Sequence, residues 1–255
     1  MLETISGFLF IVPLWMLTIW LAVLGAVWGS FVSALCSRWP KGEGIATGRS
    51  RCDSCDRQIA AYDLIPVLSF LLLKGKCRYC GQEIGRLPLA TELASIVIGV
   101  FPLALLPQDQ AVGLALFAWL LLPLVLLDWF HLWLPDRLVL LLAATGFLLG
   151  PLLDPDISLV DRGIGLSTGF LSLQAIRYFY KKYRNIDGMG AGDPKLFGAL
   201  GAWLGWQALP ITLLTASCVG LVIILLTYRS KNPEENAFPL GSYLGIGAYI
   251  AAILT

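Results

Sequence analysis

Residues 111–127 read AVGLALFAWLLLPLVLL, a run without a single charged side chain. A helix needs about 20 mainly apolar residues to cross the roughly 30 Å hydrocarbon core of a bilayer. Similar runs recur along the chain, so we read eight candidate membrane spans, at 8–36, 88–106, 111–127, 136–152, 160–178, 194–206, 208–228 and 237–254. The sequence therefore predicts an all-α polytopic membrane protein embedded in a lipid bilayer.

The composition agrees with this prediction and excludes other classes of protein. Of the 255 residues, 57% are apolar and 14% are charged, whereas soluble domains are about 45–50% apolar and about 25% charged. This balance excludes a soluble enzyme, a disordered chain and a small disulfide scaffold. The formal net charge is +1, and we expect no nucleic-acid partner.

Lysine and arginine indicate the orientation. Nine of the 18 basic residues lie in segment 37–88, and four more lie at 177–184. The intervening loops at 107–111 and 152–158 carry acidic residues and no basic ones. The positive-inside rule then places 37–88 in the cytoplasm and both termini outside it.

Segment 37–88 also holds four of the six cysteines, in two C-x2-C pairs. The first pair is Cys52 and Cys55 in RCDSC, and the second is Cys77 and Cys80 in KGKCRYC. This spacing resembles a four-thiolate zinc site. Two disulfides are the alternative, which a cytoplasmic location disfavours. Because four thiolates close the coordination shell, we expect a structural Zn²⁺ that folds a segment too small for its own core.

Two aspartates form the second chemical signal. Asp128 interrupts an apolar run, and Asp193 ends the sequence GMGAGD. Two carboxyl groups in one poorly solvated site do not both ionise easily, so one keeps a proton, and the pair can activate water against a peptide carbonyl. Gly190 and Gly192 lack Cβ atoms and allow backbone or substrate to approach Asp193 closely. The alternative is a pair of interface or helix-capping aspartates, which Pro194 favours for Asp193.

Several ordered motifs carry a family resemblance over nearly the whole chain. They are GSFVSALCSRWP at 29–40, IPVLSFLLLKGKCRYCGQEI at 65–84, LATELAS at 89–95, LDWFHLWLPDRL at 127–138, GMGAGDPKLFGALGAWLGW at 188–206 and FPLGSYLGIGA at 238–248. On these motifs the sequence resembles the type IV prepilin peptidases.

The resemblance implies a bacterial inner-membrane aspartyl protease of the GxGD type. Such an enzyme is implied to remove the leader from type IV prepilins or type II secretion pseudopilins, and to methylate the new N-terminus with S-adenosylmethionine. By motif position the catalytic residues are Asp128 and Asp193. Asp136 also matches, and we expect it to be a helix-start cap or a polar support. Four positions depart from the family pattern: Phe130 replaces a second aspartate, Ser242 replaces a proline, Ser33 stands where the family often has asparagine, and Leu87 where it often has tyrosine.

These observations divide the chain into three expected segments: the first transmembrane helix (1–36), a cytoplasmic zinc-binding and candidate methyltransferase segment (37–88), and a seven-helix protease domain (89–255). No glycine-rich loop follows a strand, which excludes a Rossmann-like methyltransferase. By motif position alone, Glu92 and Arg38 are candidate neighbours of a methyltransferase site.

Two alternatives stay open from the sequence. One is a GxGD intramembrane protease with other substrates, and the other is a non-enzymatic scaffold whose zinc knuckle docks a cytoplasmic partner. The sequence carries no signal for the oligomeric state or for which prepilin is cleaved.

Overall fold

The protein is all-helical in its computed structural model, which describes residues 12–44, 50–52, 54–185, 188–227 and 238–254. Within these ranges there is no β-strand, only two isolated bridges, Arg51–Gln58 and Lys76–Glu83. The predicted all-α class is confirmed.

A helix occupies each of the eight apolar runs. In chain order these are α2 (Leu14–Arg38), α4 (Leu87–Val100), α5 (Gln108–His131), α6 (Asp136–Leu153), α7 (Leu159–Arg184), α8 (Asp193–Leu204), α9 (Leu209–Thr227) and α10 (Leu240–Leu254). Prolines precede α2, α5 and α6 directly, and stand in the first turns of α4 and α8. A proline costs little there, because the first N–H groups of a helix have no intrahelical acceptor.

Five of these helices are long and apolar enough to cross a membrane: α2, α4 with the turn that follows it, α5, α6 and α9. Eight spans are therefore not confirmed among the described residues. Helices α8 and α10 have 12 and 15 residues, fewer than the roughly 20 that a span needs. Helix α7 is longer but carries Asp161, Arg162 and a basic last turn. The fold is that of a multi-pass membrane protein.

The helices group into two compact units, and each is described by itself. The N-terminal unit comprises Pro13–Phe101, and the C-terminal unit contains Pro102–Thr255. By contacts, α4 therefore groups with α2. The three segments expected from the sequence, 1–36, 37–88 and 89–255, are divided by function and stay a prediction.

In the N-terminal unit, α2 and α4 pack backbone against backbone. A Cβ atom added at Gly29 of α2 would lie 2.6 Å from the Cα atom of Glu92 on α4, so only glycine permits this approach. Between the two helices the chain forms the cysteine-containing segment and the short helix α3 (Leu68–Leu72).

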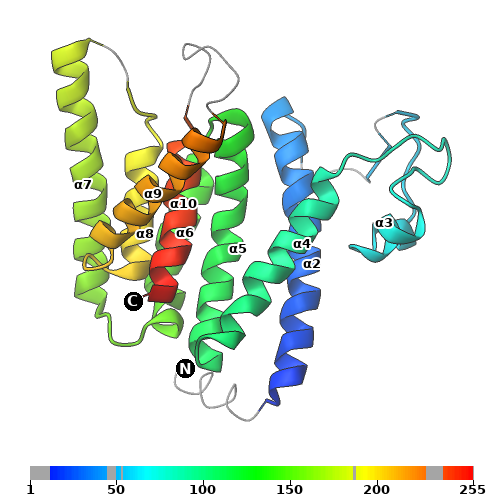
Figure 1. Ribbon diagram of the computed structural model, residues 1–255, viewed down its shortest axis with the longest axis horizontal. Helices are drawn as coiled ribbons and strands as arrows, with labels where there is room; N and C mark the ends of the chain where they lie inside the picture. The colour runs from blue at the N-terminus through cyan, green and yellow to red at the C-terminus, as the bar shows by residue number, and fades with distance from the viewer. Residues whose placement is uncertain (1–11, 45–49, 53, 186–187, 228–237, 255) are drawn as a thin grey trace. The chain divides into compact units, whose positions relative to one another are not determined.

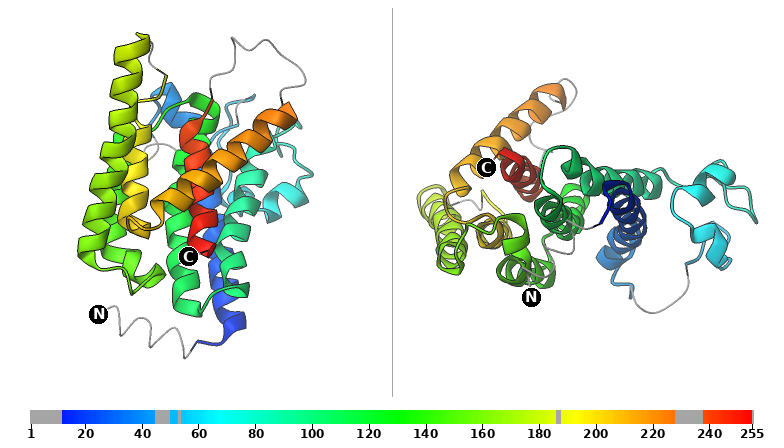
Figure 2. Two further views of the ribbon diagram at one scale, coloured as in Figure 1. Left: turned by 60° about the vertical axis from the view of Figure 1, so that its left-hand side comes forward. Right: turned by 90° about the horizontal axis from the view of Figure 1, so that it is seen from below.

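In the C-terminal unit, α5, α6, α8 and α10 lie side by side, with α7 packed on α8 (Figure 1). Helix α9 crosses α10 obliquely (Figure 2). Every residue of α8 except Lys195 is buried, because α6, α7 and α10 all contact it. Asp193, the first residue of α8, is consequently held at a defined place at one end of this bundle.

Candidate active site and metal centre

Asp128 lies in the last turn of α5 and is only 5% exposed. Its Oδ2 atom accepts hydrogen bonds from the backbone N–H of Ser242, at 2.7 Å, and is 3.0 Å from the Ser242 hydroxyl oxygen. Ser242 is fully buried in the first turn of α10. The first turn of α10 therefore holds the carboxylate of α5 in place.

Asp193 is the first residue of α8 and is also 5% exposed. The helix N-cap is Gly192, so Asp193 is the first helical residue and does not occupy the cap position. Instead, the backbone N–H of Gly190 donates to its carboxylate. A Cβ atom at Gly190 would lie 3.0 Å from Asp193 Oδ2, so a larger residue would crowd the carboxylate. Asp193 is therefore not the N-cap of α8, the alternative role that the following Pro194 had favoured.

The two aspartates, 65 residues apart in the sequence, meet around Leu134. A Cβ atom at Gly192 would lie 2.6 Å from Leu134 Cβ, and one at Gly241 would lie 2.9 Å from Leu134 Cδ1 and 3.0 Å from Asp128 Oδ2. Burial, and after it the negative charge of Asp128, raise the pKa of Asp193 to about 6. The structure thus brings two buried carboxyl groups to one site, with glycine backbone on two sides of them.

Asp136 begins α6 but does not cap it, because its N-cap residue is Pro135 and no side-chain capping bond forms. Its carboxylate pairs with Lys195 of α8, with Nζ–O distances of 2.7 and 2.9 Å. Both side chains are substantially exposed. This ion pair ties the start of α6 to the start of α8, two residues after Asp193.

Two residues near the aspartates are not predicted from the sequence as parts of the site. Arg177 of α7 donates from Nε to the carbonyl of Met189 at 3.1 Å, and its charge also acts on Asp193. In the sequence it is one member of a basic group that indicates topology. Ser242 stands out only as a departure from a motif, and its contact with Asp128 depends on tertiary packing.

The four cysteines of the N-terminal unit form one cluster. The sulfur atoms of Cys52, Cys55, Cys77 and Cys80 all lie within 4.8 Å of one another, and those of Cys52 and Cys80 are 3.8 Å apart. All four are free thiols. A tetrahedral ion with Zn–S bonds of about 2.3 Å separates its sulfurs by about 3.8 Å. The cluster therefore has the donor set and the dimensions for a metal ion.

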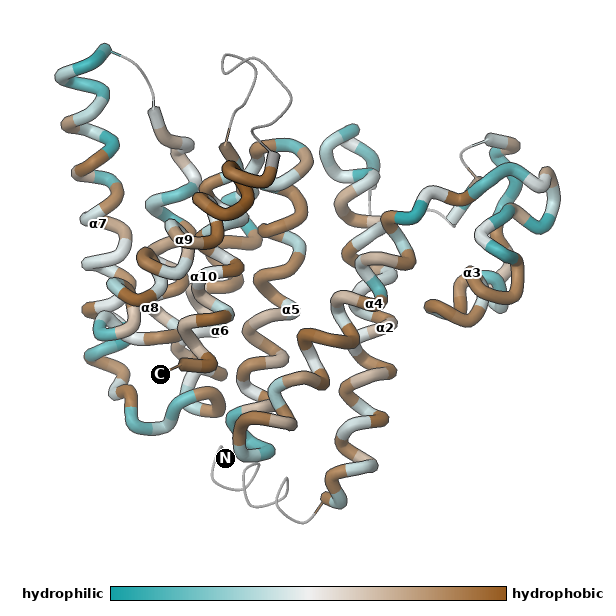
Figure 3. The backbone as a smooth tube through the Cα atoms, in the orientation of Figure 1, coloured by the Kyte–Doolittle hydropathy of each residue, from teal (hydrophilic) through white to brown (hydrophobic). Residues whose placement is uncertain are grey.

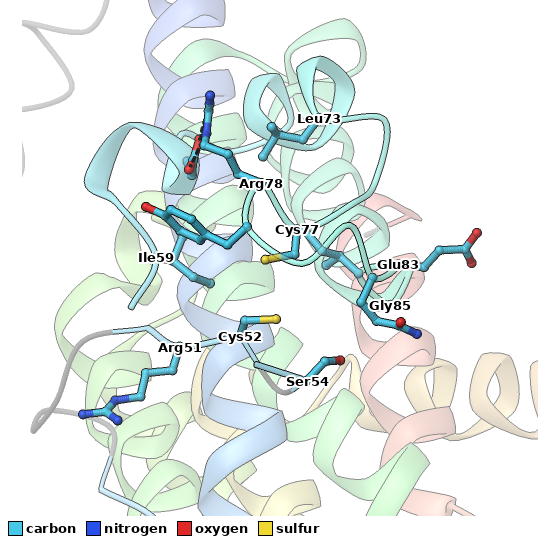
Figure 4. A pocket seen from close by; sticks show the side chains of 13 residues that line it. Arg51, Cys52, Ser54, Ile59, Leu73, Cys77, Arg78, Glu83 and Gly85 are labelled. Atoms are coloured by element: carbon cyan, nitrogen blue, oxygen red, sulfur yellow. Dashed lines mark hydrogen bonds and ion pairs between the residues drawn. The ribbon is translucent and has the colours of Figure 1, made fainter. Parts of the chain in front are cut away.

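The two C-x2-C pairs share one backbone pattern. Asp56 N–H donates to the Cys52 carbonyl, and Gly81 N–H donates to the Cys77 carbonyl, each at 2.9 Å. Both donors have positive φ angles, 52° and 71°, so each pair forms the same tight turn. The side chains of Cys52 and Cys77 point into the space between the turns (Figure 4). Hydrogen bonds from the backbone of Cys80 and Tyr79 lower the pKa of the Cys77 thiol to about 7, whereas desolvation and the neighbouring thiols raise the pKa of the Cys80 thiol to about 11. Cys77 is therefore the first of the two thiols to ionise.

A cleft of about 710 Å³ lies within the same unit, between α2, α4 and the cysteine-containing segment. Arg38 and Glu92 both line it. Glu92 is buried, and its Oε2 atom accepts a 2.7 Å hydrogen bond from the backbone of Val67. The volume lies in the range of about 300–1,000 Å³ that small-molecule sites occupy.

Comparison with known proteins identifies the family to which the chain is similar. Residues 23–105 match the bacterial peptidase A24 N-terminal domain, and residues 115–225 match the type IV leader peptidase family. No solved structure matches the chain.

Curated relatives are similar over most of the chain, and their name is prepilin leader peptidase/N-methyltransferase. The relative from Aeromonas salmonicida (strain A449) is 40% identical over 80% of this chain and 71% of its own length. The one from Pseudomonas aeruginosa is 37% identical, with the same coverage. The relative from Burkholderia pseudomallei (strain 1026b) is 36% identical over 92% of this chain and 76% of its own length.

Proposed function

The chain belongs to the type IV leader peptidase family, and from this premise we propose that it removes the leader peptide of type IV prepilins, or of type II secretion pseudopilins, with Asp128 and Asp193 as the catalytic pair. Membership makes the chain a peptidase. The observation that supports the proposed pair is that α5 and α8 each contribute one buried aspartate, and that the glycines beside them, Gly241 and Gly192, both pack against Leu134.

In the proposed reaction a transmembrane helix of the substrate unwinds at its leader junction beside the two aspartates. The ionised carboxylate takes a proton from a water molecule while the water oxygen bonds to the peptide carbonyl carbon, and the protonated partner donates its proton to the carbonyl oxygen. The C–N bond then breaks, and the leaving nitrogen takes up a proton. No covalent bond to the enzyme forms.

We propose further that this site faces the cytoplasm from the bacterial inner membrane. The support is the distribution of basic residues, half of which lie in segment 37–88. The family and the five candidate spans agree with a multi-pass membrane location.

For the cysteine cluster we propose a structural Zn²⁺. Cys52, Cys55, Cys77 and Cys80 supply four sulfurs within 4.8 Å of one another, with Cys52 and Cys80 at 3.8 Å, and zinc prefers this donor set. When bound, the ion supplies folding energy to the segment and leaves no open coordination position for chemistry.

For the methyltransferase activity that the relatives' name includes, we propose the 710 Å³ cleft as the site. S-adenosylmethionine would supply an activated methyl group there. A buried carboxylate such as that of Glu92 suits the recognition of a cationic group, either the methyl donor or the amine that cleavage releases. The amine must lose a proton before its nitrogen lone pair bonds to the methyl carbon.

The direct test incubates detergent-solubilised protein with a type IV prepilin and S-adenosylmethionine and measures the product by intact mass. We expect loss of the leader and gain of one methylene on the new N-terminus. Loss of the leader without the added methylene would support the proposed peptidase activity and contradict the proposed methyltransferase activity. If the folded protein left prepilins intact, the result would favour a GxGD protease that acts on other substrates. If it cut no substrate at all, the result would favour a non-enzymatic scaffold with a zinc knuckle.

A further inference from the structure

The cysteine-containing segment exposes an apolar surface that neither its metal site nor its cleft uses. We call it the α3 patch; its members are Ile65, Leu68, Leu71 and Leu72, exposed by 48%, 58%, 62% and 77%. Figure 3 shows this turn as apolar next to the hydrophilic remainder of the segment. A surface of this kind in contact with water marks an interaction site.

The other side of the same turn is packed, so the exposure follows from a defined conformation. Ser69, Phe70 and Leu73 line the cleft. Val67 has a φ angle of 61°, which is a strained value for a β-branched residue. Its N–H is held by the buried carboxylate of Glu92. This bond fixes which side of α3 faces the cleft and which side faces outward.

The patch lies beside the membrane-spanning helices of its unit rather than beyond their ends. The wall of the cleft runs along α2 from Ser30 to Arg38. Val67 bonds to Glu92, five residues into α4, which is about 7.5 Å along the axis at 1.5 Å per residue. In Figure 1, α3 lies lower than the upper ends of α2 and α4. The exposed leucines are therefore level with the first turns of a candidate span.

The charges around the patch match a phospholipid surface. Lys74 and Lys76 are exposed and follow α3 directly. Of the acids beside the patch, Asp63 is paired with Arg78 at 2.6 Å, and Glu83 stands opposite Lys76 in an isolated bridge, which leaves Lys74 without an acid opposite it in a bridge among the described residues. Apolar side chains next to lysines are the pattern of segments that lie in the interface of a bilayer with anionic lipids.

We propose that the α3 patch inserts into the headgroup and acyl-chain boundary of the same bilayer that α2 and α4 span, with Lys74 and Lys76 on anionic phospholipid headgroups. Both ends of the segment join candidate spans, so the bilayer is always within reach. Insertion would hold the cleft against the membrane surface. This inference depends on the membrane location and not on the proposed chemistry.

The test uses photo-crosslinking to lipid in the full-length protein. Benzoylphenylalanine replaces Leu72 in the patch or, as the matched control, Gln58, an exposed residue opposite Arg51 in the first cysteine turn. The proteins are reconstituted into phosphatidylglycerol–phosphatidylcholine vesicles with labelled lipid. We expect about tenfold more lipid adduct from position 72 than from position 58. Equal yields, or adducts of position 72 with prepilin or with a second copy of the chain, would overturn the proposal.

A second measurement keeps the proposal testable if the photoreactive residue disturbs the fold. With benzoylphenylalanine at position 72, the double variant Lys74→Gln/Lys76→Gln should lower the yield of phosphatidylglycerol adduct about fivefold, since each lysine near an anionic surface contributes attraction. Metal content of the purified protein checks that the segment is folded. An unchanged yield of anionic lipid adduct would contradict the role of the two lysines. Cleavage and methylation are not read in either experiment, so a failure here leaves the proposed activities untouched.

Discussion

Asp128 shares its Oδ2 atom with both polar groups of Ser242. The Ser242 hydroxyl also lies 2.9 Å from the carbonyl oxygen of Val125. A hydroxyl has one proton, so it donates either to an ionised Asp128 or to the Val125 carbonyl. When it donates to Val125, its oxygen can accept a hydrogen bond from a protonated Asp128. Ser242 is therefore suited to hold Asp128 in either protonation state.

Replacing Ser242 with alanine should lower kcat/KM for prepilin cleavage about tenfold, the effect of about 1.4 kcal/mol from one lost hydrogen bond. The backbone N–H of residue 242 remains as a donor, so cleavage should not disappear. Ser217→Ala on α9 is the control, because its hydroxyl bonds only to the preceding turn. Wild-type kinetics in Ser242→Ala would show that its hydroxyl does not support the aspartate.

The buried carboxylate of Glu92 leads to a separate prediction about methylation. In Glu92→Gln the amide oxygen can still accept the Val67 hydrogen bond, but the negative charge in the cleft is lost. Methylation should fall at least about tenfold, while cleavage stays near the wild-type rate. Glu83→Gln, which does not line this cleft, should methylate normally. Normal methylation in Glu92→Gln would show that the Glu92 carboxylate has no role in the proposed methyltransferase site.

At this scale, local spacing decided what could be predicted. The cysteine set is readable because two residues of each C-x2-C pair lie in one turn. Asp128 and Asp193 are readable because charge is costly among apolar residues. Ser242 is 114 residues from Asp128, and Arg177 approaches Asp193 only through the α7–α8 packing, so neither contact has a local signature.

At the scale of helices, α6 and α8 are joined at both ends. The Asp136–Lys195 ion pair joins their first turns. At the other end, the fully buried guanidinium of Arg162 on α7 donates to the carbonyls of Trp203 at 2.6 Å and Asp154 at 2.7 Å. The last carbonyls of a helix have no intrahelical donor and carry partial negative charge. Arg162 satisfies both ends with one cation.

Replacing Arg162 with methionine should destabilise the C-terminal unit by about 1–3 kcal/mol for the buried carbonyls left without a donor. The midpoint of thermal unfolding in detergent measures this loss. Arg137→Met is the control, since Arg137 is exposed on α6, and it should unfold like the wild type. An unaltered midpoint in Arg162→Met would show that the guanidinium does not join the helix ends.

Helix positions were predictable and span lengths were not. The apolar runs predict the position of every long helix that the structure describes, because a helix buried in a membrane or a core needs a long apolar segment. The run at 194–206 continues past Leu204, however, where the α8 helix ends at Gly205 with a φ angle of 72°. A short helix that is buried on all sides has the same composition as a span, so composition alone does not separate them.

At the scale of the whole molecule, the two proposed activities lie in different units. Asp128, Asp193 and Ser242 all belong to the C-terminal unit, and the cysteines and the cleft belong to the N-terminal unit. The metal should therefore matter for one activity and not for the other.

Removing the metal with a chelator should unfold the cysteine-containing segment, because metal binding supplies its folding free energy. Methylation should fall in parallel with metal content, while cleavage should keep at least about half of its rate. Adding Zn²⁺ back should restore methylation. Parallel loss of cleavage and methylation would show that the peptidase site depends on the N-terminal unit.

The most direct measurement is prepilin cleavage by Asp128→Asn and Asp193→Asn, each compared with Asp156→Asn, whose exposed side chain lies in the loop before α7. Each asparagine preserves the size of its side chain and removes its acid–base function. We predict that either variant alone is folded and metal-loaded but cleaves no prepilin, and that Asp156→Asn cleaves normally. Substantial cleavage by either Asp128→Asn or Asp193→Asn would contradict the aspartate pair as the catalytic centre.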